Sequence, residues 1–246
     1  MPRASRYLIE GYTYHLTHRC HGKEFLLRAR KDRQRYREWL REGVARFRVP
    51  VYAYSITRNH VHVVVHAVDR EAVGKLMQLA AGSLAMHYNP RNNRNGSMWE
   101  HPYHCTIIQD GRHLLNCIRY IDLNMVRAGE AAHPREWRWC GYDELTGQRS
   151  RYRILDINGL AERVGFGSAD KFHEWYKGSI EQRLSAGGLG REEHWTTALA
   201  VGSENFVSSL KGLYPQRVRL SVNRTPEGGE WVVHEERSSY GTPNSS

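Results

Sequence analysis

The sequence contains few cysteines and no long apolar segment. Its cysteines form no Cys-x-x-Cys pair, so neither a zinc ribbon nor a disulfide framework is predicted; they are Cys20, Cys105, Cys117 and Cys140. A reduced, cytoplasmic setting is the simplest interpretation. No apolar run approaches the length that spans a bilayer, and Met1–Tyr7 lacks the apolar core of a signal peptide. We therefore expect a cytoplasmic protein without membrane contact.

Acidic residues and lysine are also scarce. Asp and Glu number 26 against 36 Lys and Arg, which gives a net charge of +10, and arginine outnumbers lysine 30 to 6. Most of the excess lies in residues 1–50, which hold 13 basic and 5 acidic residues. A basic field of this kind favours a polyanionic partner, and nucleic acid fits best. Arginine binds phosphate through paired hydrogen bonds, although a GC-rich genome would produce the same bias.

The hydrophobic periodicity predicts the order β-α-β-β-α-β-α for the first half of the chain. The expected strands cover residues 11–18, 51–57, 60–67 and 103–109, and the expected helices 31–48, 70–88 and 111–128. Arg58 and Asn59 are predicted to form a hairpin turn, Asp69 to cap a helix and Gly129 to end one. This order suits an α+β fold of the ferredoxin-like type, an antiparallel sheet with helices on one face.

The composition changes beyond about residue 150. Two helical patterns over residues 156–183, separated near Gly165 and with Ser168 as the second cap, resemble a helix-turn-helix. A plain helical hairpin packed on the first domain explains them equally well. Trp195–Leu210 is expected to be a further short helix, and a loose hairpin around Pro226 precedes a disordered end. We therefore divide the chain into residues 1–148, a helical extension over 149–213 and a partly disordered tail over 214–246.

The pair His60 and His62 is the most informative pattern. It lies in a run of valines, and side chains alternate along a strand, so both imidazoles should project to one side while the valines face a core. Two such nitrogens can bind one metal ion. The alternative is a half-buried strand whose histidines are merely hydrogen-bonded. A zinc hydrolase is not favoured, because no Glu general base stands beside them.

A second pattern lies on the predicted helix 111–128. Tyr120 and Asn124 are four residues apart and are therefore neighbours one turn apart. A tyrosine can attack phosphorus when a metal ion withdraws charge from the phosphate. An amide oxygen could complete the coordination of a hard ion held by two imidazoles. Each residue alone is more simply an ordinary helix side chain; the two patterns together favour catalysis.

The run Cys117–Gly129 closely resembles the tyrosine-bearing helix of the single-tyrosine HUH transposases, in particular the REP-associated tyrosine transposases and their insertion-sequence relatives. Three other segments are similar to that family and occur in the same order; they are Tyr14–Arg19, Asn59–Val64 and Gly96–Glu100. The resemblance extends from about residue 7 to residue 145. It implies the HUH nuclease fold for residues 1–148, followed by the C-terminal helical extension.

The resemblance also implies a site. Tyr120 would attack a phosphate of single-stranded DNA, leaving a 5′-phosphotyrosine and a free 3′-hydroxyl. His60 and His62 would ligate Mg²⁺ or Mn²⁺, with Asn124 as the third ligand. Relatives act as monomers or homodimers on single-stranded DNA and DNA hairpins. Two positions depart from the family pattern, because Met125 and Arg58 stand where proline is common.

Candidate DNA contacts are arginines on the hairpin, in the basic segment 89–96 and around the tyrosine helix; they are Arg58, Arg91, Arg94, Arg119 and Arg127. A charged, solvated surface is the alternative explanation for such residues. The sequence thus predicts a metal-dependent transposase that cleaves and rejoins hairpin-bearing DNA. The main alternative is a non-catalytic, domesticated DNA-binding regulator of repeat hairpins; a replication initiator or relaxase fits the surrounding motifs poorly.

Overall fold

The computed structural model describes residues 8–100, 102–214, 219–226 and 229–236. Its strands are β1 (Thr13–Arg19), β2 (Val51–Ile56), β3 (His60–His66), β4 (His104–Ile108), β5 (Ala200–Gly202), β6 (Leu220–Arg224) and β7 (Trp231–Glu235). Its helices are α1 (Arg30–Phe47), α2 (Arg70–Met77), α3 (Ser83–Arg91), α4 (Arg112–Asp122), α5 (Asn124–Arg127), α6 (Tyr142–Leu145), α7 (Ile157–Arg163), α8 (Ala169–Ala186), α9 (His194–Thr197) and α10 (Glu204–Leu210). Single helical turns occur at His21–Lys23, Gln78–Gly82, Pro134–Glu136 and Lys211–Leu213.

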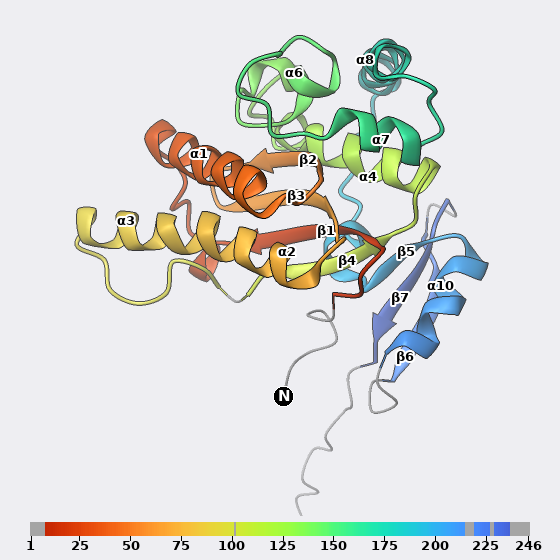
Figure 1. Cartoon of the computed structure of the whole chain (residues 1–246), viewed down its shortest axis with the longest axis horizontal. Coiled ribbons are helices and arrows are strands. Elements are labelled where there is room, and N and C mark those ends of the chain that lie inside the picture. The colour runs from red at the N-terminus through yellow and green to blue at the C-terminus, as the bar shows by residue number, and fades with distance from the viewer. Residues whose placement is uncertain (1–7, 101, 215–218, 227–228, 237–246) are drawn as a thin grey trace, which may run out of the picture.

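The strands form one sheet in the order β2-β3-β1-β4-β5-β7-β6 (Figure 1). The first four strands pair antiparallel, with α1 connecting β1 to β2 and α2–α3 connecting β3 to β4. This is the predicted ferredoxin-like core, and the α+β fold is confirmed. The sheet then continues into the C-terminal part, because β5 pairs in parallel with β4 and carries the β6–β7 hairpin beyond it.

Strand β5 lies where a short helix was predicted over Trp195–Leu210, so that prediction is wrong in its middle. The amide of Ile107 donates to the carbonyl of Leu199, and the amide of Leu199 donates to Val233. The apolar segment at Ala200–Gly202 is therefore a strand because it hydrogen-bonds to the otherwise unpaired edge of β4. Three residues are too few for an alternating pattern to be recognised in a sequence.

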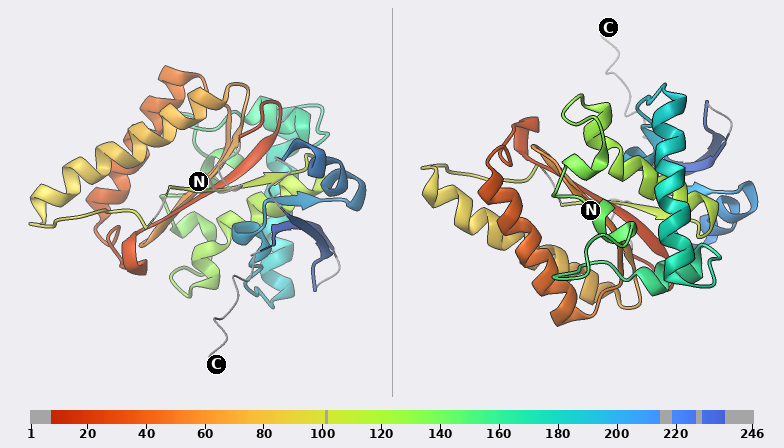
Figure 2. Two further views of the ribbon diagram at one scale, coloured as in Figure 1. Left: turned by 90° about the horizontal axis from the view of Figure 1, so that it is seen from below. Right: turned by 90° about the horizontal axis from the view of Figure 1, so that it is seen from above.

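Helices cover both faces of the sheet, whereas the sequence predicted them on one (Figure 2). On one face, His18 of β1 stacks on Trp99, which also meets Tyr36 of α1. On the other face, the ring of His62 meets Tyr120 of α4. Helix α4 covers this second face with an apolar stripe that is buried against the sheet and consists of Leu114, Ile118 and Ile121.

Local signals in the sequence are confirmed. The carboxylate of Asp69 accepts hydrogen bonds from two amides of the first turn of α2. The amide of Thr57 donates to the carbonyl of His60, which closes the two-residue hairpin between β2 and β3. Gly129 has a φ of +68°, the left-handed conformation that ends the helix before it. The predicted helix 111–128 is broken at Leu123 (φ −78°, ψ 1°) into α4 and α5.

The C-terminal helices pack on the face that carries α4. Ser168 caps α8 as predicted, and α8 buries Phe172 and Tyr176. The hydroxyl of Tyr176 donates to Asp122 of α4, so α7 and α8 form a helical hairpin anchored on the first domain. DNA binding by this pair stays a prediction. The hairpin expected near Pro226 is present as β6 and β7, and the predicted disordered end, residues 237–246, lies outside the described residues.

No described helix combines the length and the apolar character that crossing a membrane requires.

Asp122 makes the stability of this packing depend on pH. Burial raises the pKa of its carboxyl from 3.8 to about 8. The folded state therefore holds a proton that the unfolded state has lost between those values, and stability should fall as pH rises through this window, by on the order of a few kcal/mol. We expect Asp122→Asn to flatten this dependence in urea unfolding between pH 5 and 9. The exposed Asp170→Asn should leave it unchanged; an equal slope in all three proteins would contradict the prediction.

Candidate active site

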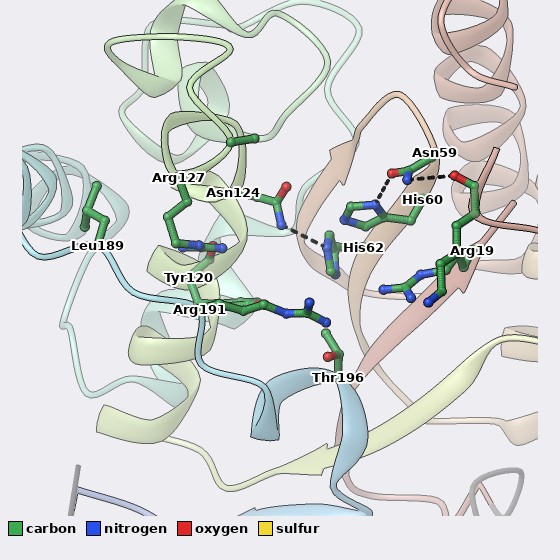
Figure 3. A pocket seen from close by; sticks show the side chains of 12 residues that line it. Arg19, Asn59, His60, His62, Tyr120, Asn124, Arg127, Leu189, Arg191 and Thr196 are labelled. Atoms are coloured by element: carbon green, nitrogen blue, oxygen red, sulfur yellow. Dashed lines mark hydrogen bonds between the residues drawn. The ribbon is translucent and has the colours of Figure 1, made fainter. Parts of the chain in front are cut away.

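A cleft of about 420 Å³ opens on the α4 face of the sheet (Figure 3). Segments far apart in the sequence line it; the lining residues are Arg19, Lys23, Asn59, His60, His62, Tyr120, Asn124, Arg127, Ala128, Leu189, Arg191 and Thr196. Four of these are cationic, and none of the described residues that line the cleft is a carboxylate. The cleft is therefore built to receive negative charge.

His60 and His62 project from β3 into this cleft, as their spacing predicts. Their ring centroids lie 4.6 Å apart and the rings are nearly perpendicular. The intervening Val61, like Val63 and Val65, is fully buried. The alternation of the strand thus separates a core face from a polar one.

Both rings are oriented through Nδ1. That of His60 donates to Oδ1 of Asn59 at 2.7 Å, and the Asn59 amide is itself held because its Nδ2 donates to the carbonyl of Lys23. Nδ1 of His62 lies 2.8 Å from Nε2 of His15. Hydrogen bonding at one ring nitrogen leaves the other, Nε2, for the cleft, which is the usual arrangement of metal-binding histidines.

Burial keeps both imidazoles neutral. It lowers the pKa of His60 to about 3, with Arg19 adding to the effect, and it also lowers the pKa of His62 well below its usual value. A neutral imidazole retains the lone pair that a metal ion needs. Nε2 of His62 lies 3.3 Å from Nδ2 of Asn124.

This donor set fits a divalent ion. Two neutral imidazole nitrogens converge beside one amide, whose oxygen would replace its nitrogen in facing the ion. Among the described residues no group of three His, Cys, Asp or Glu is placed to hold a metal. The third protein ligand in this cleft would therefore be Asn124, and a carboxylate-assisted zinc site is not supported.

Tyr120 projects from α4 into the same cleft and is 6% exposed. Its ring lies 6.3 Å from that of His62, centroid to centroid, and the guanidinium of Arg127 lies 4.0 Å from the ring centroid. Burial raises the pKa of Tyr120, while the charges of Arg127 and Arg191 oppose that rise. These cations favour the phenolate, which is the nucleophilic form of the side chain.

The break at Leu123 positions Asn124. Because α4 ends there, Asn124 begins a new helical turn and points at His62 rather than continuing the surface of α4 (Figure 3). Met125, at a position where proline is common in the family that the sequence resembles, is buried. The change of direction thus occurs without a proline.

The five predicted DNA-binding arginines divide into two groups. Arg127 lines the cleft, and Arg119 lines a neighbouring hollow that Tyr120 and Arg127 share. The other three lie outside both hollows: Arg58 pairs with Glu130, Arg91 pairs with the buried Asp32, and Arg94 donates to the carbonyl of Ser97. All five have protein partners, because Arg119 donates to Asn116 and Arg127 to the carbonyl of Tyr120. Their role in DNA binding stays a prediction.

Several lining residues were not predicted. Arg19 shares a face of β1 with His15 and Thr17, so the alternation of that strand offered a signal. Arg191 and Thr196 lie more than 120 residues beyond His62 and have no local signature. Only the tertiary fold brings them to the cleft.

Residues 9–124 match the family model described as IS200-like transposase. This segment, just under half of the chain, is similar to the IS200-like transposases. The matched segment runs from before β1 to the start of α5 and contains His60, His62, Tyr120 and Asn124. The resemblance seen in the sequence is thereby confirmed, and the family is one of DNA transposases, enzymes that cut and join DNA.

The chain also resembles a solved structure. That structure, of a REP-associated tyrosine transposase bound to a REP hairpin, shares 14% sequence identity, covers 63% of this chain and 94% of its own, and has a TM-score of 0.48. A search of curated proteins found no match. Arg127, Arg191 and Thr196 lie beyond the segment that matches the transposase family.

Proposed function

We propose that the protein is a metal-dependent transposase that cleaves and rejoins single-stranded, hairpin-bearing DNA through a 5′-phosphotyrosine intermediate. One observation carries this proposal: Tyr120, both histidines and Asn124 face a single cationic cleft without a carboxylate (Figure 3). The histidine pair of β3 and the Tyr120–Asn124 pair of α4 and α5 are therefore close enough to act on one phosphate. The cytoplasm, where the DNA is, is the proposed location.

The tyrosine would perform the covalent step. The phenolic oxygen of Tyr120 forms a bond to phosphorus, its proton passes to solvent, and the bond from phosphorus to the 3′-oxygen breaks. The 3′-oxygen leaves and is protonated, while the 5′ end stays on the protein. One phosphate ester replaces another, so no ATP is needed, and attack by a 3′-hydroxyl reverses the step.

His60, His62 and Asn124 would hold a Mg²⁺ or Mn²⁺ ion, which when bound withdraws charge from the scissile phosphate. The flanking guanidinium groups of Arg19, Arg127 and Arg191 would neutralise the remaining phosphate charge. Arg191 lies 3.7 Å from a carboxylate oxygen of Glu193, and Arg127 donates to the backbone carbonyl of Tyr120. Each guanidinium has five N–H donors, so donors remain for the DNA.

The path of the strand follows the hollows. The cleft shares Arg19, Arg191 and Thr196 with a second hollow of about 200 Å³, which reaches His104 on β4 and is also lined by Glu100, so that among its described lining residues the cations outnumber the one carboxylate. An extended strand fits such a cationic groove better than a duplex. The ring of Tyr120 lies 6.3 Å, centroid to centroid, from His62 of its own chain, which supports cleavage by a monomer with its own tyrosine.

A cleavage assay tests this function. Single-stranded hairpin DNA from the flanks of the gene, labelled at the 5′ or the 3′ end, is incubated with Mg²⁺ or Mn²⁺ and the products are denatured. The 3′-labelled fragment should migrate with the protein, and the 5′-labelled fragment should be free. Tight binding without cleavage under either ion would favour the regulator instead.

Arg127 gives the function a pH signature. Replacing Arg127 with glutamine removes the cation that opposes the raised pKa of Tyr120, so less phenolate forms at neutral pH. We expect cleavage at pH 7 to fall roughly 10- to 100-fold and the alkaline rise of the rate to move to higher pH. The rate should recover as pH increases. Arg153→Gln, at an exposed position outside the cleft, is the control; a loss that is independent of pH would contradict this explanation.

A further inference from the structure

A buried chain of hydrogen bonds connects the C-terminal extension to His62. Nδ1 of His15 lies 2.8 Å from the backbone carbonyl oxygen of Trp195, and Nε2 of His15 lies 2.8 Å from Nδ1 of His62. The two imidazoles are stacked, with centroids 4.9 Å apart. Both rings are almost completely inaccessible to solvent, so water does not substitute for either bond.

The carbonyl determines the protonated nitrogen of each imidazole, and the hydroxyl of Thr17, which lies 3.4 Å from Nε2 of His15 and 3.5 Å from Nδ1 of His62, can accept or donate and is compatible with the result. A carbonyl oxygen can only accept, so Nδ1 of His15 carries a hydrogen and donates it. In a neutral imidazole the second nitrogen is then an acceptor, so Nε2 of His15 accepts from Nδ1 of His62. His62 must therefore carry its proton on Nδ1, and its lone pair lies on Nε2.

The cleft side of His62 agrees with this assignment. Nδ2 of Asn124, a donor, lies 3.3 Å from Nε2 of His62. With the amide of Asn124 in this orientation, the opposite tautomer would place two N–H groups against each other there and two lone pairs against each other at His15. A mismatch of buried polar groups at both nitrogens is costly.

The carbonyl of Trp195 is itself held in place. The Trp195 side chain is fully buried, its Nε1 donates to Glu192, and its ring lies 6.2 Å from that of Tyr120. The hydroxyl of Thr106 on β4 donates to the carbonyl of Ala198, three residues further on. The short helix α9 is thus held in place by side-chain contacts at Trp195 and by the hydrogen bond from β4 to Ala198, which fixes the position of the Trp195 carbonyl.

We propose that His15 is a positioning residue through which the carbonyl of Trp195 sets the tautomer of His62 and thereby the metal affinity of the site. The inference rests on the proposed function, because it assigns Nε2 of His62 to the ion. Trp195 lies outside the segment that matches the transposase family, so the extension contributes to the site through its backbone. His15 itself does not touch the ion or the DNA.

Two variants of similar polarity separate this role from simple packing. In His15→Gln, the Oε1 atom reaches the place of Nε2 and still accepts from His62. In His15→Asn, the amide is too short to reach His62 and keeps only the bond to Trp195. A role in filling space predicts that both variants behave alike, whereas the positioning role predicts that glutamine rescues and asparagine does not.

The first measurement is the tautomer of His62 by long-range ¹H–¹⁵N correlation in the full chain labelled with ¹⁵N-histidine. We expect the proton on Nδ1 in the wild type and in His15→Gln, and a shift of population to the Nε2–H form in His15→Asn. A wild-type His62 protonated on Nε2, or identical spectra for the two variants, would overturn the proposal.

The second measurement is Mn²⁺ affinity by electron paramagnetic resonance, with hairpin DNA bound and Tyr120→Phe present throughout to prevent turnover. We expect roughly 10- to 100-fold weaker Mn²⁺ binding in His15→Asn and little change in His15→Gln. If no protein binds Mn²⁺ while His62 still shows the Nδ1–H tautomer, the metal dependence in the proposed function is wrong and the assignment by His15 stands. Equal Mn²⁺ affinity in both variants and the wild type would reject control of the metal by His15.

Discussion

Tyr120→Phe is expected to abolish the covalent protein–DNA adduct and to lower the cleavage rate by at least roughly 10³-fold. Only the phenolic oxygen is lost, because the ring contacts with His62, Arg127 and Trp195 do not involve it. The aromatic packing of the cleft and the hairpin affinity should therefore be retained. The measurement is adduct formation on end-labelled hairpin DNA, together with a gel-shift titration of the same variant.

Tyr152→Phe is the matched control, because Tyr152 is 71% exposed and lies outside the cleft. It should cleave like the wild type. An adduct that persists in Tyr120→Phe would identify another nucleophile and remove the central assumption of the proposed function. Loss of hairpin binding together with cleavage would show that the substitution had damaged the cleft rather than the chemistry.

His60→Ala is expected to have the second largest effect, a loss of roughly 10³-fold in cleavage at low Mn²⁺ concentration. His60 is more exposed than His62 and its removal leaves Val61 and the β2–β3 pairing untouched, so the fold should persist. The remaining ligands, His62 and Asn124, would bind the ion weakly. Raising the Mn²⁺ concentration should therefore restore part of the rate.

The measurement for His60 is the cleavage rate as a function of Mn²⁺ concentration. The midpoint should move to higher concentration in His60→Ala and remain unchanged in His87→Ala, a histidine that is exposed on α3. A lower rate with the wild-type midpoint would mean that His60 acts on the DNA rather than on the ion.

The features that depend on residues close together in the sequence could be predicted from the sequence alone. Alternation in a strand placed His60 and His62 on one side, and the carboxylate of Asp69 was recognisable as a cap. The spacing of Tyr120 and Asn124 suggested a shared face, and both line the cleft. The alternation and the cap follow from the geometry of one strand or one helical turn, which the local sequence determines, whereas the break at Leu123 that turns Asn124 towards His62 was not predicted.

The features that the sequence did not predict depend on contacts between distant segments. Nothing near Trp195 indicates that its carbonyl will meet His15, and nothing near Arg191 indicates a place beside Tyr120. The helices on the second face were missed for a related reason. Strand β3 is covered on both sides, and the histidines on one of its faces suggested that this face was open to solvent.

The parallel pairing of β4 with β5 makes the transposase domain and the extension a single hydrogen-bonded object. A chain cut after residue 148 would leave β4 as an open edge, and open edges recruit strands from other molecules. The same cut would remove part of the lining of the cleft, because Leu189, Arg191 and Thr196 lie C-terminal to residue 148. Split or fused versions of the protein are therefore better designed with breaks in surface loops than with a break near residue 148, because the pairing of β4 with β5 connects the two sides of that boundary.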